Sequence, residues 1–253
     1  MSIIKKNFLV ASDYNWLPQN IEESWVHKYT KNYLIYDRFH RYKESDKIKW
    51  QNNVGQNVYD IFYFIAKNYD NLPEATIFCR SCLMFPKYDK KPLSHGNISE
   101  ENFLKLVNNE NFTEVHDSIG PEFHKKGNSF VSKILNLIRV GKFQPSSKAD
   151  VDGGFLELNN SWYFRHFKGK YFNNLNDFLN EVYVSPVIPE YIRFSPGANY
   201  IIPKKNMLRY SKNFYEKMCE YVGWDVLVAE AHMFERLLYT IFTCDWEVKD
   251  KYK

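Results

Sequence analysis

Short apolar runs that stop at polar residues recur in the first third of the chain, at residues 7–12, 32–37 and 75–78. Such runs are typical of buried parallel strands. Between the second and third runs the apolar residues take up helical spacing, at Val58, Ile61, Phe62, Ile65 and Tyr69. Strand, crossover, strand, helix and strand predict an α/β protein with a mostly parallel central sheet and right-handed crossovers.

Further along, apolar spacing predicts helices over residues 99–109, 128–140, 176–184, 211–222 and 224–242. Residues 197–203 form a late apolar run and are predicted as a strand, while residues 151–169 suggest irregular or β structure around a glycine pair. No Pro-, Gly- or Ser-rich linker divides the chain. We therefore expect one Rossmann-like domain over residues 1–253, with a loop-rich insert at roughly 86–195.

Composition narrows the class of protein. Of the 253 residues 44% are apolar and 18% aromatic, and the formal net charge is only +4, which gives no footprint for nucleic acid. The longest apolar runs are too short to cross a bilayer, and the N-terminal residues suggest a first strand rather than a signal peptide. Four cysteines with only two close together do not form a disulfide framework. These features predict a soluble, cytoplasmic protein with no transmembrane segment and no nucleic-acid partner.

Candidate binding residues lie where the predicted strands end, because ligands of open parallel sheets bind beyond the carboxyl ends of the strands. A polar turn with one glycine (residues 53–57, "NVGQN") also opens a predicted helix, where free N–H groups can meet a phosphate. No Gly-x-Gly-x-x-Gly and no Walker lysine loop is present. Each strand end could also be an ordinary loop. The resulting nucleotide-contact candidates are Ala11, Ser12, Asp13, Tyr36, Asp37, Asn53, Gly55 and Arg80.

The third strand ends in a Cys-x-x-Cys, "CRSC", at residues 79–82. A zinc knuckle would need further ligands, and the remaining cysteines, Cys219 and Cys244, fall far away in or near predicted helices. In a redox-active Cys-x-x-Cys a helix is expected directly after the second cysteine, whereas a proline-containing segment follows here. We favour two small thiols flanking Arg80, whose fork of donors matches a diphosphate. The alternative is an ion pair between Arg80 and a nearby carboxylate.

The last predicted helix carries carboxylates on or beside its apolar face. At about 100° per residue, Glu230 falls in the middle of the apolar arc and Glu235 at its edge, with His232 and Arg236 on the opposite side. A carboxylate on an apolar face is costly unless it is paired or used chemically. Either glutamate could therefore serve as a general base, or each could form a buried ion pair or accept a backbone hydrogen bond.

Five short motifs occur in one order: "NFLVASDYNWL", "YLIYDR", "NVGQNVYDIFYFIAKNYDNLPEATIF", "FSPGANYIIP" and "MFERLLYTIF". Together they resemble a family of GT-A-like glycosyltransferase domains of unassigned function, over most of the chain except about residues 96–193. The resemblance implies a glycosyltransferase that moves a sugar from a nucleoside-diphosphate donor, by analogy a UDP-sugar, to a glycan or lipid-linked acceptor. It also implies that Glu235 is the base; Glu230, which falls in the middle of the apolar arc, is the second candidate. Asp13 or Asp37 could hold the base or ribose of the nucleotide.

Residues for the sugar or the acceptor follow the same resemblance and the local sequence. Gly197 and Ala198 would let a sugar approach the backbone closely, His95 matches a histidine that the family often has, and Trp162 is a candidate platform for the acceptor. Each of these could instead be an ordinary loop or core residue.

The chain also departs from the family. Asn15 is followed directly by Trp16 where the family has Asn-Glu, and residues 53–57 lack both the Arg and the Glu of "NVGRE". A divalent cation, Mn²⁺ or Mg²⁺, is possible, but no Asp-x-Asp is found at the end of the third strand. An alternative reading is therefore a nucleotide- or glycan-binding module that has lost catalysis.

Overall fold

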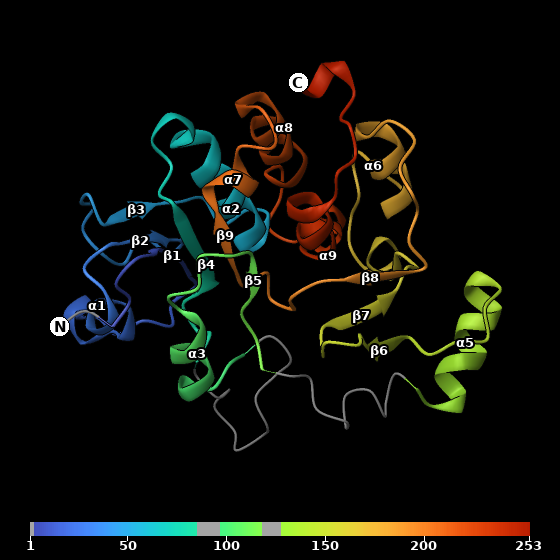
Figure 1. The fold of residues 1–253 in the computed structure, drawn as a ribbon, viewed down its shortest axis with the longest axis horizontal. Helices are drawn as coiled ribbons and strands as arrows, with labels where there is room; N and C mark the ends of the chain where they lie inside the picture. The colour runs from blue at the N-terminus through green and yellow to red at the C-terminus, as the bar shows by residue number, and fades with distance from the viewer. Residues whose placement is uncertain (1–2, 85–96, 118–127) are drawn as a thin grey trace.

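A six-stranded, mostly parallel sheet forms the centre of the protein in the computed structural model, which describes residues 3–84, 97–117 and 128–253 (Figure 1). Its strand order is β3-β2-β1-β4-β9-β5, and only β9 runs antiparallel to its neighbours. The strands are β1 (Phe8–Asp13), β2 (Tyr33–Asp37), β3 (Ile48–Trp50), β4 (Ala75–Arg80), β5 (Thr113–Glu114) and β9 (Tyr200–Pro203).

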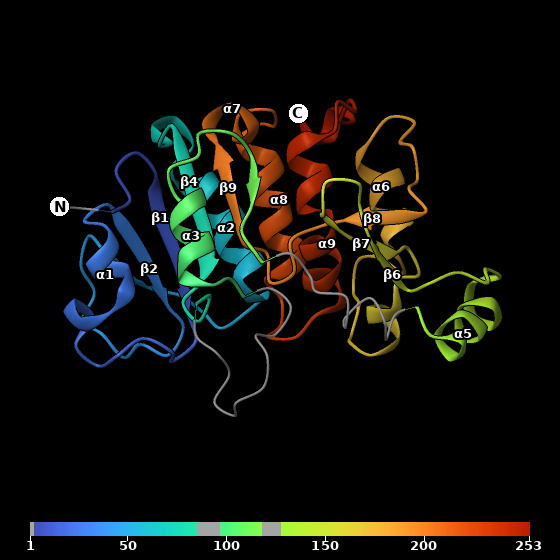
Figure 2. The ribbon, with the colours of Figure 1, turned by 60° about the horizontal axis from the view of Figure 1, so that its bottom comes forward.

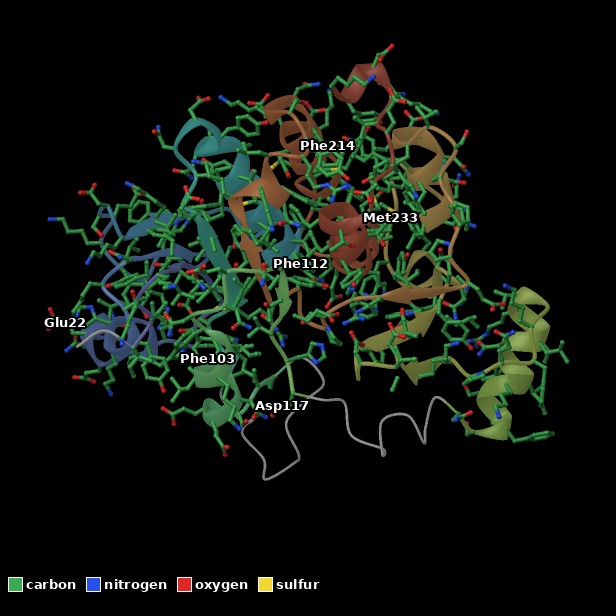
Figure 3. The ribbon with its side chains drawn as sticks, viewed as in Figure 1. Glu22, Phe103, Phe112, Asp117, Phe214 and Met233 are labelled. Atoms are coloured by element: carbon green, nitrogen blue, oxygen red, sulfur yellow. The ribbon has the colours of Figure 1, made fainter. Side chains whose placement is uncertain are left out.

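Helices cover both faces of this sheet (Figures 1 and 2). α1 (Trp25–Tyr29) and α3 (Glu100–Leu106) pack on one face, and α2 (Gln56–Lys67), α8 (Lys212–Val222) and α9 (Ala229–Thr243) on the other. Figure 3 shows Phe103 on α3, and Phe214 and Met233 on α8 and α9, on the two sides of the sheet.

β1, β2 and β4 are apolar over most of their length because both faces of the sheet are covered. In β1, Leu9 and Ala11 point to the α1 and α3 layer, whereas Val10 points to the α2 layer. Such continuous apolar runs are expected where a parallel sheet is buried on both faces.

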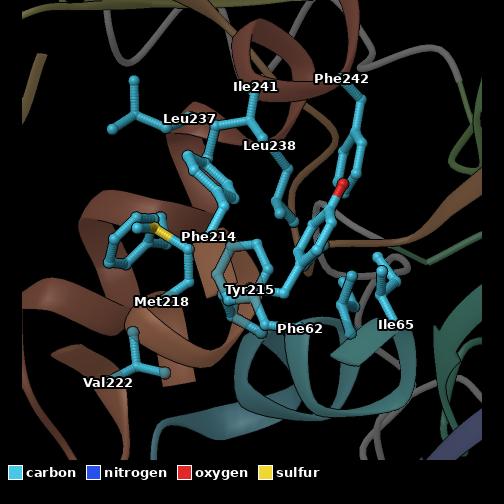
Figure 4. Close-up of a cluster of buried hydrophobic side chains, with 14 of the residues drawn as sticks. Phe62, Ile65, Phe214, Tyr215, Met218, Val222, Leu237, Leu238, Ile241 and Phe242 are labelled. Carbon is cyan, nitrogen blue, oxygen red and sulfur yellow. The ribbon is translucent and has the colours of Figure 1, made fainter. Parts of the chain in front are cut away.

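The larger core lies between α2, α8 and α9 and is rich in aromatic rings (Figure 4). Phe62 on α2 meets Phe234 on α9 edge to face, with ring centroids 5.4 Å apart, and also contacts Tyr215 on α8. Edge-to-face pairs of this kind stabilise a core beyond the area they bury. This core fixes α9 against the start of α2.

A second, antiparallel sheet lies beside the first, in the order β6-β7-β8. Arg193 on β8 pairs with Glu114 on β5 at 2.6 Å, and with Asp150 and Asp152 in the β6–β7 turn. The remaining elements are β6 (Ser147–Ala149), β7 (Phe155–Leu158), β8 (Tyr191–Arg193), α5 (Phe130–Val140), α6 (Leu175–Val182), α7 (Lys204–Met207) and the 3-10 turns η1 (Ile21–Glu23), η2 (Tyr69–Asn71), η3 (Trp162–Arg165) and η4 (Asp250–Tyr252).

The predicted mixed α/β class with a mostly parallel central sheet is confirmed. The second sheet as such was not predicted, although β7 falls within residues 151–169, where irregular or β structure was expected; the sheet lies within the expected loop-rich insert, which also holds α3, α5 and α6. β6 and β8 are only three residues long and carry too little periodicity to be recognised. The last helix begins at Ala229 rather than at residue 224. Among the described residues, no helix has the length and apolar character needed to span a bilayer.

Candidate functional site

The sheet reverses its strand order between β1 and β4, and the candidate site lies at the carboxyl ends of these two strands. The register pairs Ser12 with Arg80, so both strands end side by side. In open α/β sheets, ligands bind in the crevice that such a reversal leaves.

Asp13, at the end of β1, is buried and holds the turn that follows it. One carboxylate oxygen accepts from the backbone N–H groups of Trp16 and Leu17 and from the Ser81 hydroxyl, at 2.6 to 3.2 Å. The other oxygen pairs with Arg41 at 2.6 Å. Both carboxylate oxygens of Asp13 are therefore engaged in holding the backbone and side chains around the site.

Arg38 follows β2 and ties β1 to the "NVGQN" turn. Its guanidinium pairs with Asp60 on α2 and donates to three backbone carbonyls, one just before the turn and two within it, at 2.5 to 2.7 Å. Ser12 donates to the same Asp60 carboxylate at 2.6 Å. The three carbonyls belong to Asn52, Val54 and Gln56.

The turn itself depends on Gly55. Its φ is +59°, and a Cβ at this position would lie 2.6 Å from the carbonyl oxygen of Val222. Gln56, with φ +54°, opens α2. Asn57 then donates to the carbonyls of Gly197 and Ala198, which joins the start of α2 to the loop before β9.

Arg80 extends from the end of β4 across this loop. A Cβ on Gly197 would lie 2.7 Å from an Arg80 guanidinium nitrogen, and the φ of Gly197 is +84°. The small residue predicted to admit a sugar therefore admits the Arg80 side chain. The Arg80 backbone N–H donates to Asn199, and Arg80 remains partly exposed.

Glu235 on α9 completes the group. Its Oε1 accepts from the Gly197 N–H at 2.5 Å, and its Oε2 pairs with Arg236 at 2.9 Å; its side chain is 15% exposed. Burial alone would raise the pKa of this carboxyl, but Arg236, the Gly197 N–H, and the more distant His232 and Arg80 outweigh it and lower the pKa. Glu235 is thus a carboxylate at neutral pH.

Arg236 is buried, although the helical wheel predicted it on the polar side of α9. It pairs with Glu157 on β7 at 2.7 Å, and its guanidinium lies over the rings of Trp162, Tyr163 and Phe194 at 4.8 to 5.3 Å. The second sheet and η3 cover that side of the helix. Arg236 therefore holds Glu235 from the side of the second sheet.

His232 lies one turn before Arg236 and reaches the start of α2. Its ring stacks on Phe167 with centroids 4.1 Å apart, and its Nε2 lies 3.3 Å from the Gln56 amide nitrogen. Burial lowers the pKa of His232 to about 4, against the opposing influence of Glu235. The imidazole is therefore neutral at pH 7.

Glu230, the second predicted base, is fully buried in the first turn of α9. Its Oε1 accepts from the backbone N–H groups of Lys170 and Tyr171, at 2.6 and 2.8 Å. These bonds favour a structural role in holding the segment before α6.

Trp162 lies in a cleft of about 750 Å³ between α5, the second sheet and η3. Its indole N–H donates to Glu157 at 3.2 Å, the carboxylate that also pairs with Arg236. Glu157 therefore links this cleft to Glu235.

The remaining predicted site residues lie in the hydrophobic cores, in turns, or outside the described residues. Ala11 and Tyr36 pack in the two hydrophobic cores, and Asp37 is buried and accepts from the backbone N–H groups of Phe39 and Tyr42. Asn53 is partly exposed beside Gly55. His95 lies outside the described residues.

The residues at the switch point do not fit a divalent cation. The carboxylate at the end of β1 already accepts four hydrogen bonds or ion pairs, and β4 ends in the cationic Arg80. Among the described residues, no group of three or more His, Cys, Asp or Glu side chains could hold a metal ion. Of the two "CRSC" cysteines, Cys79 is buried in the core, and burial raises its pKa, so the thiol at neutral pH is protonated.

Sequence reasoning missed Asp60, Glu157 and Asn57. Asp60 carried a usable signal, because it interrupts the apolar face of the predicted helix between Val58 and Ile61. Asn57 lies in the "NVGQN" turn, but its contact with Gly197 and Ala198, like the contacts of Glu157, could not be foreseen because the partners come from distant parts of the chain.

No protein-family model, no curated protein and no solved structure matches this chain.

Proposed function

We propose that the protein is a glycosyltransferase that moves one sugar from a nucleoside-diphosphate donor to a glycan or lipid-linked acceptor. The observation that carries this proposal is the meeting of Arg80 and Glu235 at Gly197, beside the strand-order reversal. A cation and a carboxylate at that position suit a reaction in which one group receives a phosphate and the other a proton.

Arg80 would receive the diphosphate, since its planar fork matches phosphate oxygens and its charge offsets that of the leaving nucleoside diphosphate. No step in this arrangement calls for a protein-bound cation. Asn53 and the backbone of the "NVGQN" turn lie at the start of α2, where a helix N-terminus favours an anion.

Glu235 would take the proton from the acceptor hydroxyl as its oxygen bonds to the anomeric carbon and the bond from that carbon to the diphosphate breaks. As a carboxylate at neutral pH it can accept the proton, and Arg236 and the Gly197 N–H hold it in place. The cleft beside Trp162 has room for an acceptor sugar, with the indole as a stacking platform.

The first test is thermal unfolding against UDP, GDP, CMP and their sugars, with and without Mn²⁺. A bound ligand at roughly a hundred times its Kd is expected to raise the midpoint by about 5 to 10 °C. Arg80→Gln should remove this shift, whereas Arg209→Gln, on an exposed pair with Asp245, should retain it. A shift that needs Mn²⁺, or one that Arg80→Gln leaves unchanged, would contradict the role of Arg80.

The second test is turnover of the donor that binds. Glu235→Gln should leave the nucleotide shift in place and lower transfer by about 10² to 10⁴-fold.

A nucleotide-binding module without catalysis is the second candidate, favoured by one observation: both oxygens of Glu235 are already engaged. A full nucleotide shift without transfer to any acceptor would support this candidate.

A further inference from the structure

α5 turns its polar side toward the rest of the protein and its apolar side outward. The residue that it buries is Asn136. Six large apolar side chains in and just after the helix are instead exposed, and we call them the α5 apolar surface. They are Phe130 (68% exposed), Val131 (66%), Leu135 (38%), Leu137 (48%), Ile138 (75%) and Phe143 (49%).

Polar contacts hold the helix in this orientation. The Asn136 amide donates to the Gln144 carbonyl at 2.8 Å and to the Ser146 hydroxyl at 3.1 Å. The Ser132 hydroxyl lies 2.6 Å from the same Ser146 oxygen. α5 lies at the outer end of the molecule in both ribbon views (Figures 1 and 2).

This arrangement is the reverse of an ordinary surface helix, which packs its apolar stripe on the core and shows its polar side to water. A contiguous apolar patch of this kind marks a surface that another molecule or a membrane covers.

The charges around α5 indicate whether a second copy of the chain or a membrane covers this surface. Residues 128–149 contain no Asp or Glu and four basic residues, Lys133, Arg139, Lys142 and Lys148, of which Lys142 pairs with Glu190 at 2.9 Å. A second copy packed through the same surface would bring like charges together. Negatively charged lipid headgroups would instead complement them, while the apolar side chains enter the acyl boundary.

We propose that the α5 apolar surface docks on an anionic membrane surface, with α5 lying in the interface. The helix has 11 residues, too few to span a bilayer. This inference does not depend on the proposed transfer reaction, because none of its residues belongs to the Arg80 and Glu235 group, although Val131 and Leu135 also line the cleft beside Trp162.

The test is co-sedimentation of the full chain with phosphatidylcholine vesicles that contain or lack phosphatidylserine. The wild-type protein should bind the phosphatidylserine vesicles, and added salt should weaken binding. The double variant Leu137→Glu/Ile138→Glu should bind at least about tenfold more weakly. Lys133→Ser/Arg139→Ser should weaken binding to phosphatidylserine vesicles and reduce its salt dependence, since Lys142 and Lys148 remain. Leu208→Glu is the matched control: it places a glutamate on another exposed leucine, after α7, and should bind like wild type.

Thermal unfolding of each variant shows that it is folded. Unchanged midpoints are expected, because Leu137, Ile138, Arg139 and Leu208 are exposed and Lys133 is partly exposed. Absence of sedimentation with either vesicle, or equal binding by wild type and the Leu137/Ile138 variant, would overturn the proposal. So would a dimer in light scattering that the same double variant dissociates, because a second copy would then cover the surface.

Discussion

Arg38 and Asp60 form an ion pair that solvent does not reach: their side chains are 0% and 1% exposed, and guanidinium Nη2 lies 2.8 Å from carboxylate Oδ1. One partner follows β2 and the other lies on α2. The pair therefore fixes the start of α2, and with it the "NVGQN" turn, relative to the carboxyl edge of the sheet.

Removing one member of this pair should be strongly destabilising, because the other charge is left buried without a partner. Asp60→Asn is expected to lower the free energy of unfolding by about 3 to 5 kcal/mol, measured by chemical denaturation. Glu101→Gln, in the exposed pair with Lys105, should change it by less than about 0.5 kcal/mol. A loss below about 1 kcal/mol for Asp60→Asn would contradict the buried pairing.

Gly197→Ala should displace Arg80. The new Cβ would meet the Arg80 guanidinium at 2.7 Å, and a φ of +84° strains an alanine by about 1 to 2 kcal/mol. We expect a modest loss of stability together with weaker nucleotide-induced stabilisation. Gly141→Ala is the control: its φ is +69°, but a Cβ there meets nothing within 4 Å. It should lose stability without altering any ligand shift, and an identical ligand response from both variants would argue against the contact.

Stability should fall as the pH drops from about 6.5 to about 4, in part through His232. The folded protein keeps this imidazole neutral, with a pKa of about 4, while the unfolded chain takes up a proton near its ordinary pKa of 6.5. Unfolding therefore binds a proton in this window, and the loss contributed by His232 should reach about 2 to 3 kcal/mol. His232→Gln should remove that part of the pH dependence. Denaturation curves of the two proteins at pH 7 and pH 4 measure it, and parallel losses in both would refute it.

Substitutions should show that Glu230 has a structural role and Glu235 a chemical one. Glu230→Ala leaves the N–H groups of Lys170 and Tyr171 without their acceptor and should lower the free energy of unfolding by about 2 to 4 kcal/mol. Glu230→Gln keeps one carbonyl acceptor and should be milder. Normal stability in Glu230→Ala, combined with lost transfer, would reverse the two assignments.

The sequence sufficed for what depends on local pattern. β1, β2 and β4 and the helices α2, α3, α5, α6, α8 and α9 follow from apolar spacing, and Gly55 was recognised at the turn before α2. The sequence did not suffice to predict burial or contacts that depend on residues far away in the chain. Arg236 looked solvent-exposed on a helical wheel, and only the unpredicted second sheet, through Glu157 and the ring of Trp162, explains its burial.

The position of β9 in the sheet constrains the order in which the strands can pair during folding. β9 is inserted between β4 and β5, although residues 75–78 and 200–203 are separated by half of the chain. During synthesis on a ribosome, β4 therefore emerges with one edge unpaired and stays so until residue 203 has left the exit tunnel. Such an edge invites pairing with other nascent chains. Recognition of β4 by chaperones, and slow closure of the sheet by a contact of long sequence separation, are the expected consequences.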